Sequence, residues 1–194
     1  MKIGVLASQG AFAEHISALQ QLEVEAVPVR LPRELKGLDG LIIPGGESTS
    51  IGRLMSSYSL TGEISALAEA GLPIFGTCAG MVLMAKKVSG NNAEPLGLMD
   101  IVVRRNAFGR QRESFETELS IPVLGGEPFP GVFIRAPVIE QYDGSVEVLS
   151  RLADSTVVAV RQGSLLASAF HPELTDDLRF HKYFRDIVAG NCKK

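Results

Sequence analysis

The residue type best suited to covalent chemistry is Cys78, in the stretch PIFGTCAGM (residues 73–81). An apolar run typical of a β-strand leads into the pattern G-x-C-x-G, and a run typical of a helix follows. This is the cysteine form of a strand–turn–helix motif whose serine form, G-x-S-x-G, presents a nucleophile at the carboxyl end of a sheet. We expect Gly76 and Gly80 to remove side chains that would clash in the tight turn. The helix starting near Ala79 would point its N-terminal N–H groups at Cys78, which favours a thiolate and offers the N–H of Ala79 to an oxyanion.

A cysteine after an apolar strand is also commonly a small buried hydrophobic residue, so a nucleophile needs a base. Of the three histidines, His171 directly follows the apolar run SLLASAF and begins the tripeptide HPE. The following proline favours an extended backbone, in which His171 and Glu173 would point to the same side. Glu173 would then orient the imidazole, as the acid of a catalytic triad does. We expect His15 and His181, each in a predicted helix, to be solvated or partly packed.

A third motif, IIPGGES (residues 42–48), ends an apolar strand in two glycines. Gly45 and Gly46 would let backbone amides turn toward a bound group and supply a second oxyanion donor. Ser48 would cap the helix that follows. A plain strand-to-helix turn is the alternative interpretation of this motif.

The elements that must position these residues alternate along the first ninety residues and then become mostly strands. Strands are predicted at 2–7, 24–29, 40–46, 72–77, 99–106, 114–121, 131–139, 146–152, 156–162 and 164–170. Helical segments are predicted at 12–22, 31–38, 50–58, 62–71, 79–88 and 177–190. Continuous apolar strands between amphipathic helices indicate an α/β fold, a three-layer α/β/α sandwich with a mostly parallel central sheet of flavodoxin-like type. Residues 1–194 are expected to form a single domain.

The composition favours a globular protein that binds neither nucleic acid nor membrane. The chain has 194 residues, 45% hydrophobic and 21% charged, with a net charge of −3. No basic block beyond the final Lys193 and Lys194 offers a phosphate-binding surface, and no apolar run approaches the length of a membrane span. We expect no signal peptide, a cytoplasmic location and reduced thiols. The two cysteines form no zinc pattern, and Cys192 is assigned no role.

The motifs PGGES, GTCAG and FHPE, in this order, resemble those of the class I, or triad, glutamine amidotransferases. The stretches GVLASQGAFAEH, PGGESTS, RRNAFGRQRESFE, FIRAP and FHPELTDD are similar to the family of glutaminase subunits of the two-subunit pyridoxal 5'-phosphate synthases. The resemblance extends from about residue 2 to about residue 186. It implies the class I glutamine amidotransferase fold.

The resemblance also implies the roles of individual residues. Cys78 would attack the carboxamide of L-glutamine, His171 would transfer the protons, and Glu173 would orient His171. The products would be L-glutamate and ammonia, formed through a glutamyl thioester. Gly46 and Ala79 would form the oxyanion hole. The glutamine-binding residues would be Gly46, Glu47, Ser48, Arg105, Ile134 and Arg135.

For the two arginines, a structural or solvated salt bridge is the alternative, although few acidic residues lie near them in the sequence. Glu47 would bind the α-ammonium group of the ligand or stabilise the start of its helix. Asn106 and Gln111 to Glu113 would face a partner protein, or lie on an exposed hairpin.

The implied partner is a synthase subunit in a large hetero-oligomeric complex, which receives the ammonia for vitamin B6 biosynthesis. The resemblance implies no cofactor and no metal in this chain. Ser8 stands where the family usually has leucine, beside Gln9 and Gly10, in a segment near the expected subunit interface. We also expect low glutaminase activity without the partner, with the PGGES glycines as a peptide-flip switch.

Two alternatives stay open at this stage. The same amide-cleaving residues would serve a glutaminase of another synthase or a γ-glutamyl hydrolase. A non-catalytic flavodoxin-like redox or binding module, with Cys78 as a sensor thiol, is the other alternative.

Overall fold

The computed structural model of the chain describes residues 1–90, 95–107 and 114–192. In this part of the chain, ten strands form one sheet in the order β2-β1-β3-β4-β12-β11-β9-β6-β5, with β10 paired to β11. Strands β7 and β8 form a separate two-stranded sheet. The strands are β1 (Lys2–Leu6), β2 (Glu25–Val29), β3 (Gly40–Ile43), β4 (Ile74–Thr77), β5 (Ala85–Ser89), β6 (Met99–Arg104), β7 (Ser114–Leu119), β8 (Phe129–Ile134), β9 (Val138–Tyr142), β10 (Glu147–Arg151), β11 (Val157–Gln162) and β12 (Leu165–Ser168).

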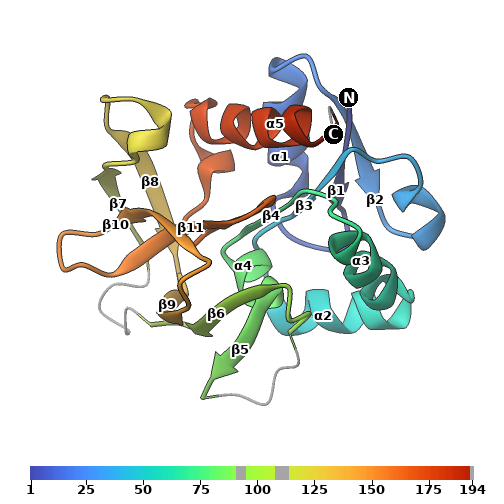
Figure 1. Ribbon diagram of the computed structural model, residues 1–194, viewed down its shortest axis with the longest axis horizontal. Helices are drawn as coiled ribbons and strands as arrows, with labels where there is room; N and C mark the ends of the chain where they lie inside the picture. Colours follow the sequence, from blue (N-terminus) through green and yellow to red (C-terminus); the bar gives the residue numbers. More distant parts are fainter. Residues whose placement is uncertain (91–94, 108–113, 193–194) are drawn as a thin grey trace.

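Helices cover both faces of the large sheet (Figure 1). The helices are α1 (Phe12–Gln21), α2 (Ser48–Ser57), α3 (Leu60–Glu69), α4 (Ala79–Met84) and α5 (Arg179–Asn191), with 3-10 turns at Pro32–Leu35, Pro122–Leu124 and Pro172–Leu174. Helices α1 and α5 lie on one face, and α2, α3 and α4 lie on the other. The connection from β1 to β2, through α1, runs toward the edge of the sheet, and the connection from β3 to β4, through α2 and α3, runs toward its middle. Right-handed crossovers in these two directions put the helices on opposite faces of the sheet. The predicted three-layer α/β fold with its mostly parallel sheet is confirmed.

The parallel half of the sheet is the centre of the core. Every residue of β3 and β4 is buried, as expected for strands covered on both faces. Phe75 of β4 packs against Phe180 and Phe184 of α5, with ring centroids 5.5 Å apart in both pairs. Phe170, just after β12, lies 5.3 Å from Phe180. These aromatic contacts fix α5 beneath the carboxyl ends of β4 and β12.

The predicted helix over residues 79–88 is wrong in its second half. Helix α4 ends at Met84, and Ala85–Ser89 is strand β5, paired in parallel with β6. All six residues of α4 are buried, so their apolar run has no periodicity that marks its end. Pairing with β6 satisfies the backbone groups of residues 85–89, and Lys86 forms an ion pair with Asp100. Such long-range pairing overrides local helix propensity.

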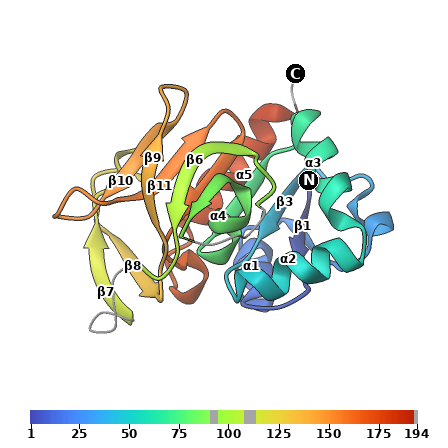
Figure 2. The same cartoon turned by 90° about the horizontal axis from the view of Figure 1, so that it is seen from below.

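The predicted strand over residues 131–139 is two strands. Its first part, β8, pairs with β7 in the small sheet, and its second part, β9, belongs to the large sheet. The break falls at Arg135, whose φ is +43°, followed two residues later by Pro137, which has no N–H for a ladder. In the view of Figure 2, the β7–β8 hairpin lies at the end of the molecule away from α2 and α3.

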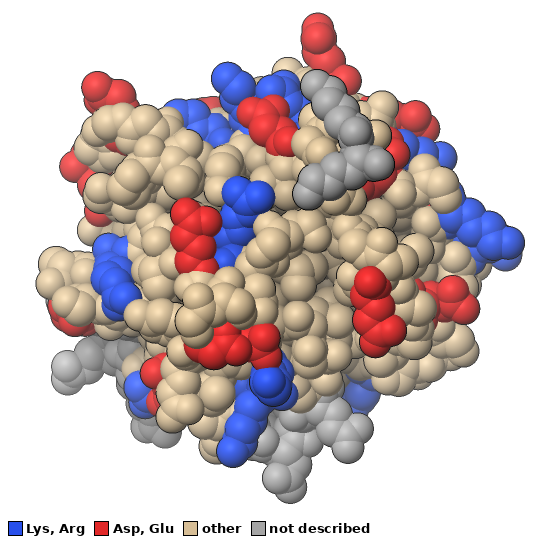
Figure 3. Space-filling model, in the orientation of Figure 1, with Lys and Arg blue, Asp and Glu red and all other residues tan. Residues whose placement is uncertain are grey.

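The surface carries mixed charge. On the face seen in Figure 3, acidic and basic side chains are interspersed among uncharged ones, which fits the small net charge of −3. Among the helices described here, none is long and apolar enough to cross a membrane.

The approach of α4 to β3 predicts a stability effect. A Cβ on Gly80 would collide with the backbone carbonyl oxygen of Ile43, which cannot move without disturbing the sheet. We expect Gly80→Ala to lower the free energy of unfolding by about 2–4 kcal/mol in urea denaturation. The control is Gly62→Ala in α3, where a Cβ meets nothing within 4 Å and the variant should be as stable as the wild type or slightly more stable. Equal stability of the two variants would contradict the close-packing argument.

Candidate active site

The register between β4 and β12 brings the two main motifs together. The strands are parallel neighbours, with Ser168 opposite Thr77. One residue further on, the N–H of Cys78 donates a hydrogen bond of 2.8 Å to the carbonyl oxygen of Ser168. The chain segments that carry Cys78 and His171 therefore leave the sheet side by side at its carboxyl edge, where open α/β sheets bind their ligands.

Cys78 has the strained backbone of a nucleophile elbow. Its φ is +48° and its ψ is −102°, a conformation that residues with a Cβ rarely adopt. The predicted role of the flanking glycines is confirmed, since a Cβ on Gly76 would lie 2.6 Å from the sulfur of Met84 and one on Gly80 would strike β3. The Cys78 side chain is nearly buried, and its Sγ lies 3.8 Å from the carbonyl oxygen of Ile134.

His171 and Glu173 form a buried pair. The imidazole Nδ1 lies 2.7 Å from Glu173 Oε1, with the histidine side chain 8% and the glutamate side chain 0% exposed. The backbone differs from the extended segment that the sequence predicts, because Pro172–Leu174 is a 3-10 turn. Proline at the first position of that turn fits its geometry, and the turn brings Glu173 back against the ring. The N–H of His171 is held by the carbonyl oxygen of Val132 in β8, at 2.8 Å.

The electrostatics favour a protonated His171. Burial works to lower the pKa of His171, but hydrogen bonds with the Cys78 side chain and with Glu173 outweigh burial and raise the pKa to about 10. Burial works to raise the pKa of Glu173, but the neighbouring His15 and His171 rings hold it below its ordinary value. A carboxylate, an imidazolium and the Cys78 sulfur thus share a site that water barely reaches.

The PGG turn touches the triad directly. The N–H of Gly45 donates to Thr77 Oγ1 at 3.0 Å. A Cβ on Gly45 would collide with the His171 ring, at 2.9 Å from Nδ1 and closer still to Cε1. The sequence motif predicted that the two glycines allow an unusual backbone conformation. It did not predict that Gly45 must lack a side chain to leave room for the His171 ring. Gly10, after β1, packs against the carbonyl oxygen of Gly45, so the β1–α1 loop supports the turn from behind.

One pocket of about 180 Å³ gathers most of the predicted site residues. Glu173 lies behind it, against His171. The pocket also includes Val82, Asn106 and Pro137. Of these, only Asn106 was expected to have a role, as a residue that faces a partner protein. Asn106 has a φ of +48°, so it joins Cys78 and Arg135 as a third strained residue of this pocket. The residues lining the pocket are Gly46, Glu47, Ser48, Cys78, Ala79, Val82, Arg105, Asn106, Ile134, Arg135, Pro137 and His171.

The cap of α2 differs from the prediction. Glu47, not Ser48, is the N-cap residue, and its carboxylate accepts hydrogen bonds from the N–H groups of Thr49 at 3.0 Å and Ser50 at 2.7 Å. Ser48 is the first residue of the helix and is buried. Partial burial of Glu47 works to raise its pKa, but these bonds lower it to about 2. Of the two roles considered for Glu47, the structure displays the helix-stabilising one.

Arg105 has an acidic partner, contrary to the expectation from its sequence neighbours. Its Nη2 lies 2.9 Å from Glu47 Oε1, and its Nη1 donates to Thr49 Oγ1 at 3.1 Å. The pair lies at the pocket, with Arg105 25% and Glu47 45% exposed. The segment Gln111 to Glu113, expected to face a partner, lies outside the described residues.

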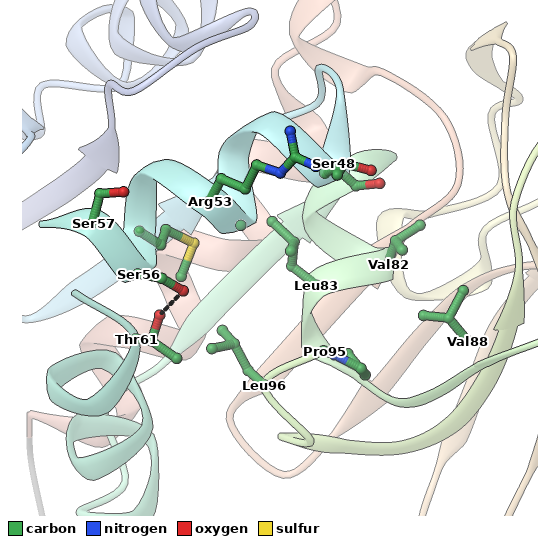
Figure 4. Close-up of a pocket in the computed structure, with 13 residues that line it drawn as sticks. Ser48, Arg53, Ser56, Ser57, Thr61, Val82, Leu83, Val88, Pro95 and Leu96 are labelled. Carbon is green, nitrogen blue, oxygen red and sulfur yellow. Dashed lines mark hydrogen bonds between the residues drawn. The ribbon is translucent and has the colours of Figure 1, made fainter. Parts of the chain in front are cut away.

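A larger pocket of about 720 Å³ adjoins the site and shares Ser48 and Val82 with it. Figure 4 shows its apolar side chains, among them Leu83 of α4 and, on the loop before β6, Leu96, with Arg53 on α2. Neither Cys78 nor His171 lines it, so we place the chemistry in the smaller pocket. No set of three or more His, Cys, Asp or Glu side chains has the arrangement of a metal site in the part of the chain that the structure describes.

The expectation for the two remaining histidines is wrong. His15 and His181 are both 0% exposed, and their rings contact each other beneath the triad. In the sequence pattern of α1, the buried face is made of apolar residues and does not include His15. Polar residues outside the apolar face of a helix are usually solvated. No sequence signal identified these histidines as part of the site.

The protonation state of His171 can be measured without substrate. Nitrogen-15 NMR titration of the three histidines should show His171 still protonated near pH 8, because its pKa is about 10, and His181 neutral, because its pKa is about 3. The variant Cys78→Ala removes a partner of the imidazolium and should lower the pKa of His171 by about one unit or more. Because the folded-state pKa lies above the ordinary 6.5, protonation of His171 stabilises the fold below that pH and loses this effect as pH rises toward 10. An ordinary His171 pKa in the wild type would contradict the coupling.

The chain is similar in sequence to a known protein family and to named proteins. Residues 5–189 match the SNO glutamine amidotransferase family. Two relatives carry the name pyridoxal 5'-phosphate synthase subunit PdxT. The protein of Moorella thermoacetica is 57% identical, over 97% of this chain and all of the relative. The protein of Pelotomaculum thermopropionicum is 56% identical, over the full length of both.

Solved structures agree with this result. A crystal structure described as a glutamine amidotransferase superposes with a TM-score of 0.92 at 50% identity, covering 96% of this chain and 98% of the other. A structure described as a putative GMP synthase subunit from Thermoplasma acidophilum has a TM-score of 0.72 at 21% identity and covers all of this chain and 96% of the other, which supports the fold alone.

Proposed function

The chain belongs to the SNO glutamine amidotransferase family, and we propose that within it the chain is the glutaminase subunit of a pyridoxal 5'-phosphate synthase. It hydrolyses L-glutamine to L-glutamate and ammonia and delivers the ammonia to a synthase subunit. The observation that carries the proposal is the imidazole of His171, bonded to a buried carboxylate and coupled to the Cys78 side chain at the carboxyl edge of the sheet. The names of full-length relatives support the synthase partner.

In the first half of the reaction, Cys78 attacks as a thiolate on the side-chain carboxamide carbon of glutamine. The resulting oxyanion accepts hydrogen bonds from the backbone N–H groups of Gly46 and Ala79. His171 then protonates the departing nitrogen, the C–N bond breaks, and ammonia leaves a glutamyl thioester on Cys78.

The electrostatics of the site help this proton transfer. Interaction with the Cys78 side chain is one of the causes that raise the pKa of His171. When the sulfur bonds to the carboxamide carbon it loses its negative charge and that cause is removed, so the imidazolium releases its proton to the leaving nitrogen more readily. The neutral imidazole then deprotonates a water molecule, which attacks the thioester and releases glutamate and the thiolate. Glu173 keeps the proton on Nδ1 throughout, so Nε2 serves the reacting groups.

Recognition of glutamine is assigned to residues around the pocket mouth. The Glu47–Arg105 pair offers a carboxylate and a guanidinium, which fit the α-ammonium and α-carboxylate groups of a free amino acid once the pair separates. Ser48, Ile134 and Arg135 complete the predicted subsite and line the same pocket.

Activation by the partner is part of the proposal. The β1–α1 loop, near the expected subunit interface, packs through Gly10 on the carbonyl oxygen of Gly45. A partner that shifts this loop would rotate the Gly45–Gly46 peptide and complete or remove an oxyanion donor. Ser8 replaces the usual leucine in this loop, and no contact described here explains the replacement.

Two alternatives have less support. A glutaminase of another synthase or a γ-glutamyl hydrolase would use the same triad, but the relatives' names favour the vitamin B6 role. A redox or binding module would have no need of a fully buried glutamate bonded to His171. A cytoplasmic location and a single domain over residues 1–194 stay predictions.

The test is a coupled assay with glutamine and the synthase subunit. We expect glutamate production to be low for the isolated chain and to rise about tenfold or more on addition of the synthase subunit. Cys78→Ala should lower that rate by at least about a thousandfold, because it removes the nucleophile. Equal rates for the wild type and Cys78→Ala would eliminate the thiol mechanism. Failure to bind the synthase subunit under saturating glutamine would argue for one of the alternatives.

The contact between Gly45 and His171 predicts a second effect on activity. In Gly45→Ala the new methyl group displaces the imidazole from Cys78, so kcat should fall about a hundredfold. Gly52→Ala in α2 is the matched control, since its Cβ would lie at an ordinary 3.5 Å from Leu83. Unchanged kcat in a folded Gly45→Ala protein would be inconsistent with the proposed geometry.

A further inference from the structure

A buried chain of polar side chains lies behind the triad. His181 Nε2 lies 2.9 Å from His15 Nδ1. The other nitrogen of His15, Nε2, lies 3.2 Å from Thr77 Oγ1 and 3.4 Å from Glu173 Oε2. All four side chains are buried, and they come from α5, α1, β4 and the turn after β12.

The charges around His15 determine where its proton lies. Burial, the strongest influence, and the nearby His171 lower the pKa of His15, while Glu173 and Glu14 of the same helix raise it by a smaller amount. Burial also lowers the pKa of His181 to about 3, so both rings are neutral at pH 7. A neutral imidazole next to a carboxylate is favoured with its hydrogen on the nearer nitrogen, here Nε2. His15 Nδ1 then accepts a hydrogen bond from His181 Nε2–H.

An imidazole approaches each of the two oxygens of Glu173, but only Oε1 has a hydrogen bond. Oε1 accepts the hydrogen bond from His171, and a fully buried carboxylate with a single partner would be costly to ionise. At Oε2, the Nε2–H group of the neutral His15 ring lies 3.4 Å away, longer than a hydrogen bond, and attracts the carboxylate through its N–H dipole. Thr77, which accepts from Gly45 N–H, receives the hydrogen bond of His15 Nε2–H and links the same ring to the PGG turn.

We propose that His15 is a positioning residue for the triad: its Nε2–H keeps Glu173 ionised and aimed at His171, and holds Thr77 against the Gly45 amide. His181 fixes the orientation of the His15 ring. The proposal rests on the proposed function for its consequence in glutamine hydrolysis. Its effect on the Cys78 thiolate is independent of that function, because loss of the ionised Glu173 weakens the imidazolium that stabilises the thiolate.

The experiment compares His15→Gln with His15→Asn in the full-length protein. The amide of glutamine reaches the place of Nε2, next to Glu173, whereas the shorter asparagine places its amide near Nδ1, next to His181. Both are made in a Cys192→Ser background, so that iodoacetamide reports on Cys78. The rate of alkylation is followed against pH, with kcat and KM measured in the presence of the synthase subunit.

We expect His15→Asn to lower the alkylation rate at pH 7 about tenfold and move its pH midpoint upward, with kcat reduced at least tenfold and KM changed less than about twofold. His15→Gln should recover most of each loss. Ser150→Ala removes a part-buried hydrogen bond from β10 to the carbonyl oxygen of Ser120, outside the elements that carry the triad. It controls for general destabilisation and should leave the pH profile unchanged.

Wild-type pH profiles in both His15 variants would overturn the proposal, as would equal losses in both. An altered alkylation profile without any glutamate production by the wild type would instead support the positioning role and contradict the proposed function. The two proposals therefore fail separately.

Discussion

The parallel pairing of β4 with β12 is the constraint on which the rest of the molecule depends. Their register sets Thr77 opposite Ser168, and the hydrogen bond from Cys78 N–H to Ser168 continues the ladder one residue beyond the strands. Cys78 and His171 are separated by more than ninety residues in the chain, but this register leaves them beside each other. A shift of one residue would turn the side chains of β12 to the opposite face and separate the sulfur from the imidazole.

The site combines strain and desolvation, and the surrounding core maintains both. Cys78, Asn106 and Arg135 have positive φ angles around one pocket, and each lies within two residues of the end of a strand. A fully buried carboxylate stands behind the pocket between two imidazoles. The aromatic rings of Phe75, Phe170 and Phe180 pack under these groups and exclude water, which strengthens every charge interaction above them.

The sequence predicted what local patterns encode. Buried strands ending in glycine or cysteine, the elbow at Cys78 and the proximity of His171 to Glu173 all follow from motifs of a few residues. The predictions were wrong where contacts with distant segments of the chain determine the secondary structure or the burial of a residue. Residues 85–89 form a strand because β6 lies beside them, and residues 131–139 divide because their halves pair with different sheets. Burial of His15 depends on α5, which lies far from it in sequence, and the Glu47 cap replaced Ser48 because its longer side chain reaches two N–H groups.

The position of β12 has a consequence for how the chain acquires its structure. This strand enters the sheet between β4 and β11, at its middle, although about 160 residues precede it in the chain. During synthesis, the units β1 to β4 can pair with one another, but the inner edge of β4 stays open until residues 165–168 leave the ribosome. Such late, non-local closure slows folding and leaves an apolar strand edge available to other chains meanwhile. The same closure that completes the fold brings His171 to Cys78, so a partly folded chain holds an isolated cysteine rather than a working triad.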